Sequence, residues 1–153
     1  MEISDKMKTI ILFLSLLLNI QTFAAHSSLT TLDGQEVSRK ELQGRWLVLQ
    51  YWADWCDICM GEMPELQDLY NHINKNKARM YLVNFDGLSQ RQLQKVFHQH
   101  HISIPSLKGD PAGSYGIHGI TALPVMIIVN PQGKVHKVLY GPQSSRKILR
   151  MLK

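Results

Sequence analysis

The apolar positions of this chain fall into short runs separated by polar segments. Trp46 to Trp52 is nearly continuous in residues that favour strands, which is the pattern of a strand buried on both faces. Met80 to Phe85 and Val125 to Val129 repeat the pattern on a smaller scale. These three runs predict the strands at the centre of a sheet.

A helical pattern stands between the first two runs. Its apolar residues recur at spacings of three and four, at Met63, Leu66, Leu69, Tyr70 and Ile73. Strand, helix and strand in this order form a βαβ unit, which requires parallel strands and a right-handed crossover.

The remaining elements are predicted from their turn and cap residues. Asp33-Gly34 centres a small hairpin over Leu29 to Val37, and Ser89 caps a second helix. A turn at 130–133 leads into Val135 to Tyr140 as an antiparallel strand. Ser144 or Ser145 caps a last helix. Without repeats or a linker, the chain is predicted to be one α/β domain with a mixed sheet.

The amino-terminal segment has a different character. Lys6 and Lys8 precede the apolar run from Ile10 to Leu18, and small residues follow. This pattern is typical of a secretory signal peptide over residues 1–25, leaving 26–153 as the folded domain. An uncleaved membrane anchor remains an alternative, and both place the domain outside the cytoplasm.

Composition narrows the function classes. Of 153 residues, 44% are hydrophobic and 19% charged, which argues against a disordered chain. The net charge of +5 is not gathered into the stripe of a nucleic-acid binder, so no nucleic-acid partner is expected. Only two cysteines are present, which excludes a disulfide-stapled scaffold and a four-cysteine zinc site.

Cys56 and Cys59 lie between the first core strand and the first helix, and three chemistries compete for them. A structural disulfide closing so short a loop contributes only about 2 kcal/mol in the chain-entropy model. A metal site needs two further ligands that no second cysteine pair supplies. A redox-active dithiol is favoured, because a helix start stabilises the Cys56 thiolate and Cys59 lies one turn further on.

The surrounding residues resemble a known family. The segment Trp52 to Cys59 resembles the active site of thioredoxin-fold proteins. Leu32 to Val37, followed by Leu42-Gln43-Gly44, is similar to the lead-in of the exported TlpA/ResA/CcmG branch. Cys59 to Leu66 matches that branch in placing Glu and then Pro after the second cysteine.

The likeness continues to the carboxyl end of the chain. Leu123-Pro124-Val125 and the segment Asn130 to Val135 resemble the family's cis-proline strand and hairpin. Over residues 29 to 152 the resemblance implies an α/β thioredoxin-like fold: a central mixed β-sheet flanked by helices, with an N-terminal β-hairpin extension. The chain departs from the common pattern at Ile58 and Val125, where relatives often carry Pro and Thr. Many thioredoxins have a buried Asp where this chain has Gln50, and the exported branch often has an amide there.

Roles for three residues follow from spacing and resemblance together. We expect Cys56 to be the attacking thiolate, Cys59 the resolving thiol and Cys56–Cys59 the redox-active disulfide. Glu62 lies on the same helical face as Cys59 and is the candidate proton carrier, with a solvated helix glutamate as the alternative.

Three further residues are expected to bind substrate. Trp55 is expected to cover the thiols, and the resemblance implies that Pro124 is cis. The backbone at Leu123 would then pair with an extended substrate segment. The histidines at 98, 100 and 101 fall at a helix end and are expected to be solvated rather than to bind metal.

The predicted function is an exported, periplasmic thiol–disulfide oxidoreductase that reduces protein disulfides through a mixed disulfide. The resemblance implies substrates in cytochrome c maturation or copper-site assembly and a membrane thiol as electron donor. No cofactor and no resident metal are expected. The protein is expected to be a monomer. Two alternatives stay open: a disulfide oxidase or isomerase, and a copper-binding metallochaperone module.

Overall fold

The computed structural model describes residues 29–153, so the expected signal segment 1–25 lies outside the described residues. A four-stranded sheet has the order β4-β3-β5-β6. Its strands are β3 (Trp46–Trp52), β4 (Ala78–Asn84), β5 (Val125–Val129) and β6 (Val135–Tyr140). β3 and β4 are parallel, whereas β5 is antiparallel to both of its neighbours, β3 and β6. The mixed sheet predicted from the sequence is confirmed.

The strand bounds agree with the sequence at β3, β5 and β6, but the prediction for β4 was wrong at both ends. The strand starts at Ala78 because all seven residues of β3 pair with β4, beginning with Trp46 opposite Ala78. Phe85 follows the strand, although its N–H still donates to the Trp52 carbonyl at 2.9 Å.

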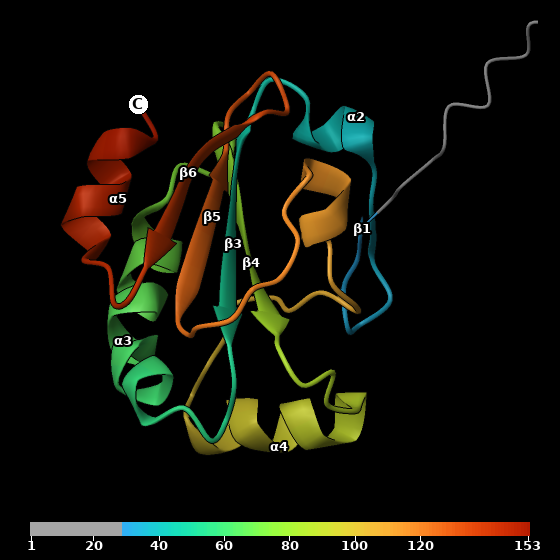
Figure 1. The fold of residues 1–153 in the computed structure, drawn as a ribbon, viewed down its shortest axis with the longest axis vertical. Helices are drawn as coiled ribbons and strands as arrows, with labels where there is room; N and C mark the ends of the chain where they lie inside the picture. Colours follow the sequence, from blue (N-terminus) through green and yellow to red (C-terminus); the bar gives the residue numbers. More distant parts are fainter. Residues whose placement is uncertain (1–28) are drawn as a thin grey trace, which may run out of the picture.

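Three longer helices surround the sheet: α3 (Asp57–His72), α4 (Gln90–Gln99) and α5 (Ser145–Met151). Figure 1 shows α3 and α5 side by side on one side of the sheet. Ser89 caps α4 in a complete capping box, and Ser144 rather than Ser145 caps α5. The sequence pattern did not predict α2 (Arg39–Leu42) or the 3-10 turn η1 (Ala112–Tyr115).

Alternate residues of β3 enter two separate cores, which explains why the whole strand is apolar. Val48 and Trp52 face the core that contains α3, α4 and α5. Leu47, Leu49 and Tyr51 face the second core, on the side of α2 and η1. Both faces of the central strand are therefore covered, as the sequence predicts.

The expected hairpin is present as β1 (Leu29–Thr30) and β2 (Glu36–Val37), which pair antiparallel. Gly34 supplies the positive φ of 88° that its turn requires. Thr31 joins the hairpin to the rest of the domain through an isolated bridge to Leu107. Within residues 29–153, no helix combines the length and the apolar character needed to span a membrane.

Candidate functional site

The two cysteines form a disulfide at the start of α3. Cys56 takes the N-cap position, and its Sγ accepts the Cys59 N–H at 3.2 Å. The sulfurs are 2.08 Å apart and the Cα atoms 5.2 Å apart. Cys56 is 8% exposed and Cys59 only 1%, so the first sulfur is the one that another molecule reaches more readily.

Glu62 is buried one helical turn beyond Cys59, with 5% of its surface exposed. Its Oε1 accepts the backbone N–H of Gln143 at 2.6 Å, and its Oε2 accepts the Gln50 side chain at 3.3 Å. Burial raises the pKa of Glu62, the Gln143 N–H opposes this, and the charge of Glu65 adds to it. The alternative of a solvated helix glutamate is therefore wrong.

Gln50 reaches Glu62 from the middle of β3. It lies between Val48 and Trp52 on the strand and is itself buried. Because an amide does not titrate, the carboxyl group of Glu62 is the titratable member of this buried pair.

Trp55 precedes the disulfide and is 63% exposed, so most of its surface is open to solvent. Its indole N–H donates to the Asp86 carboxylate at 2.5 Å, which fixes the ring against the loop after β4. Ile58, between the two cysteines, is 60% exposed, and Phe85 is also exposed. The disulfide thus lies among apolar side chains that face solvent.

Leu123 and Pro124 lie at the same end of the sheet as the cysteines. β5 pairs with β3 so that Val125 lies opposite Tyr51, which places the preceding two residues beside the end of β3. The Leu123–Pro124 bond is cis, as the resemblance implies. The Pro124 carbonyl accepts the Gly141 N–H at 2.9 Å, and Leu123 is half-buried.

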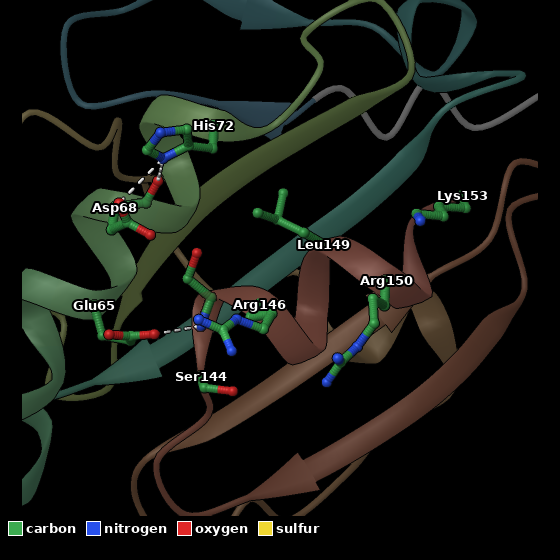
Figure 2. A pocket seen from close by; sticks show the side chains of 9 residues that line it. Glu65, Asp68, His72, Ser144, Arg146, Leu149, Arg150 and Lys153 are labelled. Carbon is green, nitrogen blue, oxygen red and sulfur yellow. Dashed lines mark hydrogen bonds and ion pairs between the residues drawn. The ribbon is translucent and has the colours of Figure 1, made fainter.

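Two grooves run along α3. A groove of about 390 Å³ has Ile58, the residue before Cys59, and Glu62 on one wall and the loop before α5 on the other. A second groove, of about 800 Å³, lies further along, between α3 and α5. Figure 2 shows this second groove, with Glu65, Asp68 and His72 on one wall and Arg146 and Arg150 among the residues opposite. No cysteine lines either groove.

Some features of the site were not predicted. Asp86 could have been found, because it follows β4 at the sheet end where the cysteines lie. Gln143 carries no comparable signal in the sequence. Over residues 29–153, no group of three or more His, Cys, Asp or Glu side chains is arranged to hold a metal ion.

The sequence matches a known protein family. The AhpC/TSA family model matches residues 20–138. The thiol-disulfide oxidoreductase ResA of Oceanobacillus iheyensis is 25% identical over 109 residues, which are 71% of this chain but only 56% of that relative.

Solved structures give the same fold. StoA from Bacillus subtilis superposes with a TM-score of 0.69 at 21% identity, over 84% of this chain and 97% of that one. The exposed lipoprotein thioredoxin Etrx1 of Streptococcus pneumoniae superposes with a TM-score of 0.66 at 19% identity, over 84% and 98%. The thioredoxin-like fold expected from the sequence is confirmed.

Proposed function

Because this chain belongs to the AhpC/TSA family, we propose that it is an exported thiol–disulfide oxidoreductase that reduces protein disulfides. One observation carries the proposal: Cys56 caps a helix start and is bonded to the more deeply buried Cys59. The N–H groups and positive dipole end of α3 favour a thiolate at Cys56 once the pair is reduced.

The exchange proceeds in two displacements. The Cys56 thiolate attacks one sulfur of a substrate disulfide, forming a mixed disulfide and releasing the other sulfur as a thiolate. Cys59, deprotonated, then attacks the Cys56 sulfur and releases the second substrate thiolate. Two electrons have moved to the substrate, and the Cys56–Cys59 disulfide has formed. A dithiol donor, which we propose to be a membrane protein, returns the pair to the reduced state.

Glu62 is the proposed proton carrier for Cys59. It lies one turn beyond Cys59 on α3, is buried, and is held by hydrogen bonds from two other elements. A carboxyl group whose pKa is raised by burial can accept the Cys59 proton when the mixed disulfide is resolved. In the reverse direction it returns the proton to the leaving Cys59 thiolate.

Trp55, Leu123 and Pro124 are the proposed substrate contacts. Trp55 offers an exposed apolar face beside Cys56, and Leu123 lies at the same end of the sheet, where an extended segment could pair with its backbone. Export to the periplasm is supported by the pattern of residues 1–25 and by the likeness to an exposed lipoprotein thioredoxin. Cysteines that must accept haem or copper are the proposed substrates.

Trapping tests the exchange. Cys59→Ala is expected to accumulate a mixed disulfide with protein substrates, and Cys56→Ser to accumulate none. The equilibrium constant of the Cys56–Cys59 pair with glutathione distinguishes a reductase from an oxidase. A reductase has a reduction potential well below that of the glutathione pool. If Cys56→Ser retains full exchange activity, or if Cys59→Ala traps no reducible partner, the proposal is wrong.

A further inference from the structure

Gln143 lies in the loop between β6 and α5, and its side chain closes that loop. The amide Nε2 donates to the carbonyl oxygens of Tyr140 at 3.2 Å and Gly141 at 2.8 Å. The amide Oε1 accepts a hydrogen bond from the ammonium of Lys147, in the first turn of α5, at 2.7 Å. Gln143 is buried although it lies in a loop, so its amide groups have partners within the protein.

The backbone of the same residue binds the proposed proton carrier. The Gln143 N–H donates to Glu62 Oε1 at 2.6 Å, across a sequence separation of 81 residues. The direction of a backbone N–H in a loop is set by the conformation of that loop. The side-chain bonds of Gln143 to Tyr140, Gly141 and Lys147 therefore fix the direction of the N–H that meets the carboxyl group.

We propose that the Gln143 side chain is a positioning residue: by closing the loop and binding Lys147, it aims its own backbone N–H at Glu62. In this way it sets the pH at which Glu62 gains and loses its proton. The use of this role in disulfide exchange rests on the proposed function. The hydrogen bond from the Gln143 N–H to Glu62 does not.

The groups around Glu62 determine how a substitution at Gln143 can change the pKa of Glu62. On α3 the charge of Glu65 favours the protonated form of Glu62, and on β3 Gln50 offers a neutral amide. On α5 the ammonium of Lys147 binds Gln143 and not Glu62 itself. The Gln143 N–H lowers the pKa of Glu62 against the larger effect of burial, so losing the bond raises the pKa further.

The test measures the titration of Glu62 directly in the oxidised protein. Carbon NMR of the Glu62 carboxyl group gives its titration midpoint, with Glu62→Gln identifying the resonance. Gln143→Met keeps the length of the side chain but removes its donors and its acceptor. We expect its midpoint to rise by about one pH unit, the effect of weakening one hydrogen bond to a charged group.

A second variant covers the case in which Gln143→Met does not fold. Lys147→Met removes only an exposed ammonium, and a smaller upward shift is expected. Arg146→Met removes the same charge from the neighbouring exposed position and should leave the midpoint in place. A folded Gln143→Met with the wild-type midpoint would overturn the proposal, as would an unshifted Lys147→Met where Gln143→Met is unfolded.

Kinetics separate this inference from the proposed function. Reduction of the disulfide by dithiothreitol is expected to show a pH dependence that moves with the Glu62 midpoint in Gln143→Met. If the wild-type protein exchanges no disulfide with proteins, the proposed function fails while the NMR midpoints still decide the role of Gln143. If the protein is active but the two midpoints coincide, the inference fails alone.

Discussion

Gln50 donates its side-chain N–H to the Glu62 carboxylate at 3.3 Å, while its own side-chain oxygen is buried without a hydrogen-bond partner among the described residues. A carboxylate can only accept hydrogen bonds, so it cannot satisfy that oxygen. The donated N–H favours the charged form of Glu62, but burial, which is the larger effect, favours the uncharged form.

Glu62→Gln is expected to stabilise the oxidised protein at neutral pH, by roughly 1–2 kcal/mol, because it removes a charge that is costly to bury. Burial raises the pKa of Glu62 above its ordinary value of 4.5. The folded protein thus holds this proton at pH values where the unfolded chain has lost it. Stability from this group is full below pH 4.5 and falls as the pH rises through the folded pKa.

Urea unfolding of the oxidised protein between pH 4 and pH 8 measures this effect. The Glu62→Gln variant should lose the part of the pH dependence that Glu62 contributes. Glu36→Gln, which neutralises an exposed carboxylate on β2, is the matched control and should keep the wild-type dependence. Equal stability of wild type and Glu62→Gln across this range would contradict the argument.

Local sequence patterns were sufficient to predict most of the strands and helices. The bounds of β3, β5 and β6 follow from runs of apolar residues, and the start of α4 follows from Ser89 with Gln92. α2 and η1 were missed because each spans only four residues, too few to show a period. The error at β4 arose because Arg79 interrupts the apolar run, although its backbone pairs with Leu47.

Spacing alone predicted the site only where its residues are close in sequence, whereas Leu123 and Pro124 were placed there by resemblance. The Cys56, Cys59 and Glu62 positions follow from helical spacing, which places all three near one helix start. The burial of Glu62 does not follow from spacing, because it depends on the loop that contains Gln143. That contact joins residues 81 positions apart, and neither residue has a pattern that points to the other.

Trp55 is expected to contribute to the binding of protein substrates and little to the chemistry. Exposed tryptophan side chains often dominate the energy of an interface, and this ring is held in place by Asp86. Trp55→Ala should raise KM for a protein disulfide about tenfold, equivalent to ~1.4 kcal/mol. KM for a small aromatic disulfide should change by less than about twofold, because that substrate lacks the surrounding surface.

Trp55→Phe serves as the control for this prediction, since it keeps an apolar ring and loses the N–H that binds Asp86. We expect KM for the protein disulfide to lie between the values for wild type and Trp55→Ala. An equal loss with protein and small-molecule substrates would show that Trp55 acts on the sulfur chemistry instead.

Glu65 is expected to stabilise the start of α5. Its Oε1 accepts the N–H of Ser145, the first residue of that helix, at 2.6 Å (Figure 2). A carboxylate at a helix amino terminus both satisfies a free N–H and complements the helix dipole. Glu65→Ala should lower the free energy of unfolding by about 1 kcal/mol. Asp68→Ala removes only a surface pair with His72 and should cost less than about 0.5 kcal/mol.

Tyr51 ties the sheet to the segment that leads toward Pro124. Its hydroxyl donates to Asp110 Oδ1 at 2.6 Å, and the same oxygen accepts the Ala112 N–H at 2.8 Å. Burial raises the pKa of Tyr51, and the Asp110 carboxylate raises it further, so the hydroxyl remains a donor across the working pH range. Tyr51→Phe should therefore destabilise the protein by about 1–2 kcal/mol in urea unfolding. Tyr140→Phe, which alters an exposed tyrosine, should change stability by less than about 0.5 kcal/mol, and equal effects of the two variants would contradict the assignment.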